Sequence, residues 1–474
     1  MSALAQLGIR ANAITADSRK AAPGSVFFAY PGESADGRDY IAQAVAQGVS
    51  GVLWERENFT WQNAWDVPNA PVVNLRGATG GIASEFYGEP SQRLHMIGVT
   101  GTNGKTSCSH WLAAALTRLG QKTAVIGTLG NGFPGALSEA VNTTPDPILL
   151  HGMLADYLAQ GAASAAMEVS SHGLTQGRVN GVAFNIAVLT NLTRDHLDYH
   201  GNMEIYADAK RRLFHWPDLQ CAVVNIDDDF GMEIAEDAAC RDLHVITYGL
   251  KNGDVRGQHL ELRDNGLQMD VVTPAGNAHI ETALMGRFNA YNLLAVLTTL
   301  LASQVPLEKA LDAIKDLRPV AGRMQTFGGG NQPLVVVDYA HTPDALEKVL
   351  ATLREQSRGK LICVFGCGGN RDKGKRSLMG TIASRIADRV VVTSDNPRNE
   401  DPQDIIRQVL TGMSGDVITE PDRAAAINLA VRDAQIGDIV LVAGKGHEAY
   451  QEIAGVKYPF DDRIVAQQAL EARA

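Results

Sequence analysis

The chain has 474 residues, of which 45% are hydrophobic and 20% are charged, and its formal net charge at pH 7 is −11. This length exceeds what one hydrophobic core supports and indicates about three globular domains. The acidic balance argues against a protein that binds nucleic acid by neutralising phosphates, and no apolar run is long enough to span a bilayer.

The N-terminus and the cysteines indicate the cellular compartment. No long apolar stretch follows a basic region at the N-terminus, so we do not expect a signal peptide. The five cysteines are scattered and suggest neither a disulfide framework nor a paired zinc motif. We therefore expect a cytoplasmic protein without membrane insertion. We also expect it to be a monomer.

The hydrophobic pattern of residues 1–75 predicts a small α/β domain. The apolar runs 26–30 and 52–55 are typical of strands, and residues 40–47 between them predict a helix. The glycine-rich stretch 74–81 is typical of a linker to the next domain.

Residues 76–321 alternate between predicted strands and helices, which indicates a doubly wound, mostly parallel sheet. The predicted strands are 96–99, 123–128, 165–169, 186–191, 222–226 and 244–248. The predicted helices are 147–159, 203–215, 230–239, 289–302 and 307–317, besides one that begins near residue 107. Residues 260–263 and 267–272, joined by 264–266, predict an added hairpin.

Residues 322–474 repeat this alternation and predict a Rossmann-like domain. The predicted strands are 334–339, 361–365, 390–393 and 439–442, and the helices include 344–354 and 378–387. Polar residues cluster just after these strands, where open parallel sheets bind their ligands.

The strand at 96–99 leads into a glycine turn, then into Lys105 and Thr106 at the start of a helix. Backbone N–H groups at such a turn bind phosphate oxygens, the lysine supplies a cation, and the threonine offers a hydroxyl to Mg²⁺. The usual spacing requires a glycine five residues before Gly104, where this chain has Val99. An ordinary glycine-rich turn is the alternative, but it gives the lysine and hydroxyls no purpose. We therefore predict a nucleoside triphosphate site with an uncommon loop.

Three polar clusters follow other predicted strands of this sheet. They are residues 142–145, residues 168–172 with Gln176 and Arg178 beyond them, and residues 191–200. A single Glu or His is usually structural or solvated. Several together on the phosphate-loop side of one sheet favour a divalent cation site with carboxylate and imidazole ligands.

Lys210 falls within the apolar stripe of the helix 203–215, which Met203, Tyr206, Leu213 and Phe214 form. One interpretation is a lysine that extends its amine outward to water. The other is a neutral amine that reacts with CO₂ to give a carbamate, a carboxylate able to hold Mg²⁺. The residue pattern alone leaves both open.

The last domain carries four polar clusters after its strands, at 338–341, 368–372, 395–398 and 444–448. Two arginines and two acids from separate strands suit a zwitterionic ligand, because guanidinium groups bind carboxylates and acids hold an ammonium.

Taken together, these motifs resemble the Mur ligase family over essentially the whole chain. The segments that carry the resemblance stand in family order: GVTGTNGKTS, NTTPDP, MEVSSHGL, NLTRDHLDYHG, AKRRLF, GRFNAYN, DYAHTPD, GCGGNRDKGKR, DNPRNEDP and AGKGHE. The uncommon phosphate loop is itself a family feature.

The resemblance implies three domains, with residues 1–75 for a UDP-sugar substrate, 76–321 for ATP and 322–474 for an amino acid. It implies an ATP-dependent amide ligase that adds a third peptide residue to UDP-MurNAc-L-Ala-D-Glu in peptidoglycan precursor synthesis. ATP would phosphorylate the terminal D-Glu carboxylate, and the amine of the third amino acid would attack the acyl phosphate. ATP and Mg²⁺ are the implied cofactors.

The resemblance also implies roles for single residues. The ATP-binding residues would be Gly101, Thr102, Asn103, Gly104, Lys105, Thr106, Ser107, Asn289, Asn292, Arg323 and Asp338. Mg²⁺ would be held by Thr106, Glu168, His196 and Lys210 as its carbamate, and Lys105, Glu168, His196 and Lys210 would be catalytic. Contacts to the UDP-MurNAc-dipeptide would come from Ser18, Glu33, Ser34, Ala35, Asn142, Thr143, Thr144, Ser170, Gln176 and Arg178, although Glu33 and Ser34 depart from the family pattern.

The third amino acid is expected to be meso-diaminopimelate rather than L-lysine, which lacks the distal carboxylate. The residues implied in binding it are Arg371, Asp395, Asn396, Pro397, Arg398, Gly444 and Glu448. Pro397 fixes the turn that presents Arg398, and the DNPR string resembles the diaminopimelate-adding members. An arginine that only caps its own loop is the alternative.

Two other functions compete with this one. A P-loop switch protein would carry a guanine-reading Asn-Lys-x-Asp segment, which this sequence lacks. A folylpolyglutamate synthetase or a neighbouring Mur enzyme is the closer competitor, and the substrate that stimulates phosphate release would distinguish them.

Overall fold

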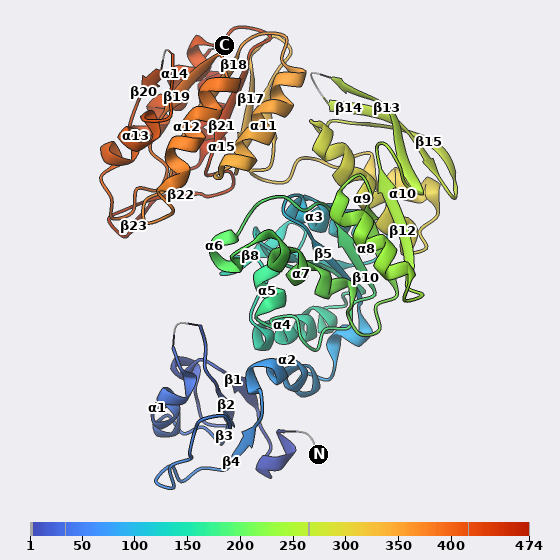
Figure 1. The fold of residues 1–474 in the computed structure, drawn as a ribbon, viewed down its shortest axis with the longest axis vertical. Coiled ribbons are helices and arrows are strands. Elements are labelled where there is room, and N and C mark those ends of the chain that lie inside the picture. The colour runs from blue at the N-terminus through green and yellow to red at the C-terminus, as the bar shows by residue number, and fades with distance from the viewer. Residues whose placement is uncertain (1–2, 34, 264–265, 416, 474) are drawn as a thin grey trace. The chain divides into compact units, whose positions relative to one another are not determined.

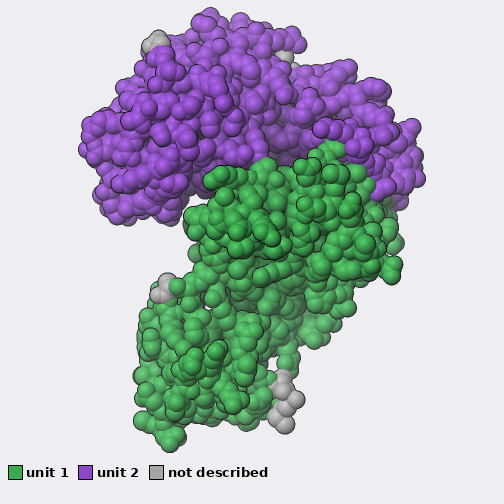
Figure 2. All heavy atoms as spheres, in the orientation of Figure 1, with its two compact units in different colours: residues 1–248, 298–305 green, residues 249–297, 306–474 purple. Residues whose placement is uncertain are grey.

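A computed structural model describes residues 3–33, 35–263, 266–415 and 417–473. The chain divides into two compact units (Figure 2). Unit 1 comprises Met1–Tyr248 with Thr298–Val305, and unit 2 comprises Gly249–Leu297 with Pro306–Ala474.

Unit 1 begins with a parallel four-stranded sheet in the order β1-β2-β3-β4 (Figure 1). Its strands are β1 (Ala13–Thr15), β2 (Ser25–Ala29), β3 (Gly51–Glu55) and β4 (Asn69–Val72), with α1 (Ile41–Ala46) and the short helices η1 (Ala5–Leu7), η2 (Ser18–Lys20) and η3 (Gly37–Tyr40). The predicted strands at 26–30 and 52–55 and the helix at 40–47 are confirmed within about one residue at each end.

The prediction of a linker at 74–81 is wrong, because α2 (Leu75–Phe86) covers one face of this sheet. Asn74 caps the helix by accepting a hydrogen bond from the N–H of Gly77 at 3.2 Å. A Cβ atom on Gly80 would lie 2.1 Å from the carbonyl oxygen of Asn180. The glycines therefore allow close packing of a helix and do not mark a flexible segment.

The second sheet of unit 1 runs in the order β12-β11-β10-β5-β9-β6-β7-β8. The strands β12 to β6 in this order are parallel, and β7 and β8 extend the edge in antiparallel fashion. Their bounds are β5 (His95–Thr100), β6 (Thr123–Gly127), β7 (Gly130–Phe133), β8 (Ala136–Ser138), β9 (Ser164–Glu168), β10 (Ile186–Leu189), β11 (Cys221–Asn225) and β12 (His244–Gly249). The predicted doubly wound, mostly parallel sheet is confirmed.

Helices cover both faces of this sheet. One face packs side chains of α4, α7 and α8 into a common core, whereas α3 packs against β5, β6 and β9. The helices are η4 (Pro90–Arg93), α3 (Lys105–Arg118), α4 (Pro147–Ala159), α5 (Ser171–Thr175), α6 (Leu197–His200), α7 (Met203–Phe214) and α8 (Asp229–Ala239).

Unit 2 begins with an antiparallel meander of β13 (Val255–Arg263), β14 (Gly266–Thr273) and β15 (Gly276–Thr282). The predicted hairpin is confirmed, with β15 as a further strand, and residues 264–265 of its turn lie outside the described residues. The helices α9 (Arg287–Ala302) and α10 (Leu307–Ile314) follow.

The last sheet has the order β16-β17-β21-β18-β19-β20 and is parallel except at the edge strand β16. Its strands are β16 (Gln325–Gly328), β17 (Leu334–Asp338), β18 (Leu361–Phe365), β19 (Arg389–Val392), β20 (Val417–Thr419) and β21 (Ile439–Ala443). Helices α11 (Pro343–Gln356), α12 (Gly374–Ile386) and α13 (Pro402–Leu410) contribute to one core, and α14 (Arg423–Asp433) and α15 (Asp462–Glu471) to another. The predicted Rossmann-like arrangement is confirmed.

A separate antiparallel hairpin, β22 (Tyr450–Ile453) and β23 (Val456–Pro459), follows β21. None of the helices in the described ranges is long and apolar enough to cross a membrane.

Candidate active site

The phosphate loop, residues 101–107, follows β5 and leads into α3 at the predicted place. Gly101 has a φ of 143° and Gly104 a φ of 88°, and a Cβ atom on Gly101 would lie 1.9 Å from Thr190 Oγ1. The loop therefore requires glycine at position 101 for space as well as conformation. Lys105 is the first residue of α3, and its Nζ donates to the carbonyl oxygens of Gly101 and Thr102 at 2.9 Å each.

The segment after β10 supports this loop from the neighbouring strand. Asn191 accepts a hydrogen bond from the N–H of Thr102 with its carbonyl oxygen and one from the N–H of Asn103 with Oδ1. Thr190 and Asn191 donate to the carbonyl oxygen of Asn103 at 2.6 and 3.1 Å. Of the buried side-chain nitrogens in the described residues, Asn103 Nδ2 is one that has no hydrogen-bond partner. A rigid loop with an unsatisfied buried donor fits an oxygen-rich ligand.

Glu168, at the end of β9, lies against the start of α3. Its Oε2 accepts from Thr106 Oγ1 at 2.9 Å, and its Oε1 accepts from the N–H of Thr128 at 2.8 Å. Thr128 Oγ1 also donates to Oε2 at 3.2 Å. The structure thus brings together the Glu168 carboxylate and the Thr106 hydroxyl, two of the predicted Mg²⁺ ligands. Thr106 directly follows Lys105 in the sequence.

Lys210 is buried on α7, with 1% of its surface exposed, so the prediction that it lies in the apolar stripe is confirmed. Its Nζ donates to the carbonyl oxygen of Gly101 at 2.8 Å and lies 4.6 Å from the centre of the Tyr206 ring. Burial, with a further contribution from Lys105, lowers the pKa of Lys210 well below its usual value. The amine therefore favours its neutral, nucleophilic form.

Tyr206 connects several predicted residues, although the sequence suggested only an apolar role for it. Its hydroxyl lies 3.1 Å from Thr102 Oγ1, and its ring centre lies 6.1 Å from that of His196. His196 also contacts the ring of His172 at 4.8 Å, and burial lowers the pKa of both imidazoles. A tyrosine hydroxyl on the same stripe as a lysine was the available signal for this role.

The donor set around the phosphate loop fits Mg²⁺ that is bound together with the phosphates of a nucleotide. Thr106 and Glu168 supply hard oxygen donors, which Mg²⁺ prefers. Within the described ranges, no group of three or more His, Cys, Asp and Glu residues is arranged to hold a metal ion. A carbamate on Lys210, whose Nζ contacts the carbonyl oxygen of Gly101, would be a further carboxylate at this loop.

Four of the residues implied in dipeptide binding form one hydrogen-bond chain in unit 1. Thr144 Oγ1 donates to the carbonyl oxygen of Glu168 and lies 3.0 Å from Ser170 Oγ. Arg178 donates to the carbonyl oxygen of Thr144 and to Gln176 Oε1, each at 2.8 Å. The predicted cluster after β9 is therefore compact and adjoins Glu168.

This chain continues to the first sheet through Tyr199, which the sequence-based assignment omitted. Gln176 Nε2 donates to the Tyr199 hydroxyl at 3.2 Å, and that hydroxyl donates to Glu33 Oε1 at 3.0 Å. Arg76 also pairs with Glu33 at 3.2 Å. Glu33 thus joins the predicted group despite its departure from the family pattern.

The other residues predicted to contact the dipeptide have no hydrogen bond to this chain among those of the described residues. Ser18 is buried, and its hydroxyl donates to Gln43 at 3.2 Å, whereas Ala35 is exposed and its carbonyl oxygen accepts from the N–H of Gly32. Asn142 is exposed, and Thr143 Oγ1 lies 3.0 Å from Thr128 Oγ1. Ser34 lies outside the described residues.

Four predicted nucleotide-binding residues belong to unit 2. Asn289 and Asn292 are buried on α9 and bond to each other at 3.1 Å. Asp338 ends β17 and accepts from the N–H groups of Met324 and Ala340 at 2.8 Å each, and burial raises the pKa of its carboxyl. Arg323 stacks on the Tyr339 ring at 4.7 Å, and its Nε is a buried donor without a partner among the described residues. These features fit a polar ligand at the end of β17.

The residues predicted to bind the amino-acid substrate lie around the loop 395–398, which follows β19. A Cβ atom on Gly368 would lie 3.0 Å from Arg398 Nη1 and 3.8 Å from Arg371 Cγ, so the two arginines flank this glycine. Arg371 is exposed, whereas Arg398 donates from Nε to Glu452 at 3.1 Å and from Nη1 to the carbonyl oxygen of Gly369 at 2.8 Å.

Two residues of this predicted site, Asn396 and Glu448, accept hydrogen bonds from a lysine to which the sequence analysis gave no role. Lys445 is fully buried and donates from Nζ to Asn396 Oδ1 at 2.9 Å and to Glu448 Oε2 at 3.0 Å. Asn396 Nδ2 also donates to Glu448 Oε2, and a Cβ atom on Gly444 would lie 2.6 Å from Asp395 Oδ2. The position of Lys445 in AGKGHE was the available signal.

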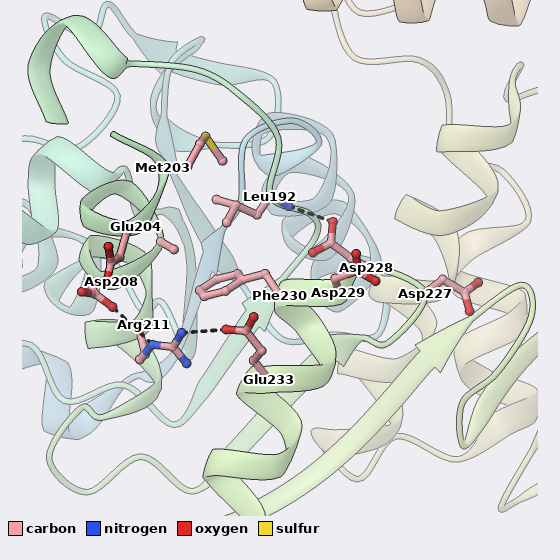
Figure 3. A pocket seen from close by; sticks show the side chains of 11 residues that line it. Leu192, Met203, Glu204, Asp208, Arg211, Asp227, Asp228, Asp229, Phe230 and Glu233 are labelled. Carbon is pink, nitrogen blue, oxygen red and sulfur yellow. Dashed lines mark hydrogen bonds and ion pairs between the residues drawn. The ribbon is translucent and has the colours of Figure 1, made fainter. Parts of the chain in front are cut away.

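A pocket of about 540 Å³ lies between α7 and α8, near the carboxyl ends of β10 and β11 (Figure 3). Asp228 accepts a hydrogen bond from the N–H of Leu192 at 3.0 Å, and Arg211 pairs with Glu233 at 2.9 Å. Six of its eleven lining residues are acidic and none is a predicted site residue. Such a lining disfavours phosphate, so this pocket is not the triphosphate site.

Models of three Mur ligase domains match the chain: the Mur ligase family catalytic domain over residues 10–87, the Mur ligase middle domain over 99–300, and the Mur ligase glutamate ligase domain over 322–446. The UDP-N-acetylmuramoyl-L-alanyl-D-glutamate–2,6-diaminopimelate ligase of Chromobacterium violaceum is 55% identical over 473 residues, covering 99% of this chain and 96% of the relative. The ligase of the same name from Nitrosomonas europaea is 52% identical, covering 98% of this chain and 94% of the relative.

Solved structures agree with these matches. A structure of a ligase of the same name has a TM-score of 0.74 at 38% identity, covering 98% of this chain and 95% of that chain. A MurF ligase from Thermotoga maritima in complex with ADP shares the fold, with a TM-score of 0.67 at 18% identity and full coverage of both chains. The chain therefore belongs to the Mur ligase family, as its motifs predicted.

Proposed function

We propose that this protein is an ATP-dependent ligase that joins meso-diaminopimelate to UDP-MurNAc-L-Ala-D-Glu in peptidoglycan precursor synthesis. The observation that carries the proposal is the identity of 55% over 99% of the chain with a relative named for this activity. The Mur fold alone would leave the substrate open, since one fold hosts many functions.

In the first step, ATP would phosphorylate the terminal D-Glu carboxylate to an acyl phosphate. Gly101, Thr102, Asn103, Gly104 and Ser107 would hold the phosphates through the loop, and Lys105 would offset the charge of the transferring phosphoryl group. Mg²⁺ would be held by Thr106, Glu168, His196 and the Lys210 carbamate, and it would offset charge between the β- and γ-phosphates. Asn289, Asn292, Arg323 and Asp338 would bind the base and ribose.

The dipeptide substrate would lie along the hydrogen-bond chain of unit 1. Arg178 and Gln176 would bind its anionic groups, with Thr144 and Ser170 at the Glu168 end of the chain and Asn142 and Thr143 beside them. Ser18 and Glu33–Ala35 would contact the UDP part. Glu33 has a lowered pKa because Tyr199, Arg76 and Gln176 donate to its carboxylate against the opposing effect of burial, so it offers an ionised acceptor at neutral pH.

In the second step, the amine of diaminopimelate would attack the acyl carbon, and the tetrahedral intermediate would expel phosphate. Arg371 and Arg398 would each bind a carboxylate, and Glu448 would hold the distal ammonium. Asp395, Asn396, Pro397 and Gly444 would shape the site around them.

We further propose that the functional domains are residues 1–75, 76–321 and 322–474. The cytoplasmic location, the monomeric state and the absence of nucleic-acid partners stay predictions of the sequence.

The proposal is tested by phosphate release from ATP with the purified protein. We expect release that requires UDP-MurNAc-L-Ala-D-Glu, diaminopimelate and Mg²⁺ together, with a product whose mass equals the sum of the two substrates minus water. Release that depends instead on a folate and glutamate would identify a folylpolyglutamate synthetase and overturn the proposal. A requirement for UDP-MurNAc carrying a shorter or longer peptide would identify a neighbouring Mur enzyme.

A further inference from the structure

The strand β22 and the first residue after it are hydrogen-bonded to the loop 395–398. Gln451 Nε2 donates to the carbonyl oxygen of Asp395 at 2.7 Å, and the N–H of Glu452 donates to Asn396 Oδ1 at 2.9 Å. The N–H of Arg398 donates to the carbonyl oxygen of Glu452 at 3.0 Å, and the N–H of Ala454 donates to the carbonyl oxygen of Arg398 at 2.7 Å. Both backbone groups of Arg398 are therefore fixed by the hairpin.

This attachment holds Arg398 in an uncommon backbone conformation. Its φ is 51°, in the left-handed region that a residue with a long side chain rarely adopts. A conformation of this kind persists only where the surroundings enforce it, and it is frequent at ligand-binding positions. Here the enforcement comes from Glu452 and Ala454.

The side chain of Arg398 is oriented from two directions. Glu452 Oε2 accepts from Nε at 3.1 Å, and the carbonyl oxygen of Gly369 accepts from Nη1 at 2.8 Å. The side chains of Arg398 and Glu452 keep 19% and 25% of their surface exposed. Within the described residues these two acceptors do not engage Nη2, so that side of the guanidinium can still bind an anion.

We propose that Glu452 is a positioning residue that selects the amino acid by orienting the guanidinium of Arg398 toward the distal carboxylate of diaminopimelate. The inference rests on the proposed function and deepens it, since it names the residue that orients the Arg398 side chain before the substrate binds. A guanidinium fixed before binding loses less side-chain entropy when the carboxylate arrives. L-lysine has no distal carboxylate, so the orientation of the Arg398 guanidinium does not affect how tightly L-lysine binds.

The opposite arrangement is conceivable from the same contact, because Glu452 is itself a carboxylate beside Arg398. It would then compete with the substrate for the guanidinium. The position of the contact favours orientation, since Glu452 binds at Nε and leaves Nη2 unused. The two arrangements give opposite results when the carboxylate is removed.

The test compares Glu452→Ala, Glu452→Gln and a control with the wild type, using the full chain, saturating ATP and UDP-MurNAc-L-Ala-D-Glu. Glu347→Ala is the control, because Glu347 forms an exposed ion pair with Arg385 on the outer surface of α11 and α12. Each protein is assayed for kcat and KM with diaminopimelate and, separately, with L-lysine.

We expect Glu452→Ala to lower kcat/KM for diaminopimelate about tenfold, mainly through KM, and to leave L-lysine within about twofold. Glu452→Gln keeps an oxygen acceptor for Nε and should recover most of the loss. In an Arg398→Ala background the further change Glu452→Ala should have no effect on selectivity, because the guanidinium that Glu452 orients is absent.

Three results would overturn the inference. A lower KM for diaminopimelate in Glu452→Ala would show competition, equal losses with both amino acids would show a merely structural role, and additive losses with Arg398→Ala would show independent action. A wild type that does not use diaminopimelate would instead refute the proposed function itself, which separates the two failures.

Discussion

Lys210 illustrates how one residue acquires chemistry from its surroundings. Its amine is buried beside a carbonyl oxygen and an aromatic ring, and no carboxylate is hydrogen-bonded to it in the described residues. A buried ammonium without a hydrogen-bonded anion is costly, so burial favours the neutral amine, which is the form that reacts with CO₂. The sequence left a solvent-directed lysine open, and the burial removes that option.

We predict that Lys210 is carbamylated and that Lys210→Ala lowers ligation about a hundredfold, as expected when an essential ligand or its support is lost. Short-chain carboxylic acids should restore part of this activity by supplying a carboxylate in the vacated space. The measurements are ligation rates with and without added acetate, and a carbonyl signal from protein equilibrated with ¹³C-labelled bicarbonate. Lys105→Ala is the matched control, since acetate should not rescue it. Full wild-type activity in CO₂-depleted buffer, without the labelled signal, would contradict the prediction.

Lys105 has a different role, because its amine is only half-buried and bonds to the phosphate loop itself. Lys105→Ala should lower ATP-dependent ligation by about 10²–10³-fold, the usual effect of removing one donor to a transferring group. Its melting temperature should stay close to that of the wild type, and so should that of the exposed control Lys20→Ala, which should also keep its activity. Ligation by Lys105→Ala at a near wild-type rate would mean that this loop is not the phosphate site.

At the scale of elements, strands that are apolar along their whole length were predictable and edge elements were not. Runs such as 96–99 and 361–365 are buried on both faces of a parallel sheet and leave a continuous apolar signal. The short edge strands β1, β8 and β20 lack it. The glycines of α2 are typical of a linker in the sequence, because the close approach of Asn180 that requires glycine at position 80 is a tertiary contact.

The candidate site was predictable to the extent that its residues stand at strand ends in recognisable strings. The structure places Thr106 in contact with Glu168 and buries Lys210, and the parallel sheet brings the strands that carry the clusters side by side. Tyr199 and Lys445 stand inside the predicted clusters but were given no role, whereas Tyr206 and Glu452 were not assigned to the site, because their contacts with Thr102 and Arg398 join residues distant in the sequence. The helical stripe and the AGKGHE string mark such residues as candidates, but a long-range pairing is not visible in the sequence itself.

The connection between α12 and the loop after residue 398 is held by an ion pair whose strength depends on pH. Glu400 accepts two hydrogen bonds from the fully buried Arg376 at 2.9 and 3.0 Å and one from the N–H of Asn370. Arg376 and this N–H lower the pKa of Glu400 from 4.5 to about 2. The folded state therefore binds the proton more weakly than the unfolded state, so the stabilisation is complete above pH 4.5 and is lost as the pH falls toward 2.

We predict that Glu400→Gln destabilises unit 2 by about 3 kcal/mol at pH 7, because it leaves a buried guanidinium without its counter-ion. The difference from the wild type should narrow as the pH falls from 4.5 toward 2. Denaturant unfolding at several pH values measures this difference. Glu347→Gln, which breaks an exposed ion pair, should change stability by less than about 1 kcal/mol and show no such trend. A pH-independent difference for Glu400→Gln would refute the assignment of the lowered pKa.

At the scale of the molecule, this acidic protein gathers cationic groups at two places where we propose that anions bind. The net charge is −11, yet Lys105 and Lys210 converge on Gly101 in unit 1, and Arg371 and Arg398 flank Gly368 in unit 2. Local fields of this kind can recruit anionic substrates although the overall charge repels them. The surface as a whole then discourages nonspecific binding of polyanions.

The choice of the third amino acid decides which cell-wall precursor the molecule makes, and it depends on one carboxylate. Binding L-lysine would leave the available side of the Arg398 guanidinium without an anion, which costs about 1–3 kcal/mol or more when the group is desolvated. This corresponds to about tenfold or greater discrimination. We therefore predict a kcat/KM for meso-diaminopimelate at least about tenfold above that for L-lysine, measured with the purified protein at saturating ATP and UDP-MurNAc-L-Ala-D-Glu.

Arg398→Ala should abolish this preference by lowering the value for diaminopimelate while leaving that for L-lysine nearly unchanged. Arg398→Lys should recover little of it, because an ammonium cannot form the bidentate contact of a guanidinium and cannot be oriented at Nε by Glu452. Arg432→Ala is a suitable control, since Arg432 is exposed on α14 and its ion pair is with the adjacent Asp433. Equal use of both amino acids by the wild type, or a preference for L-lysine, would show that Arg398 caps its own loop and that the distal carboxylate is not what this site recognises.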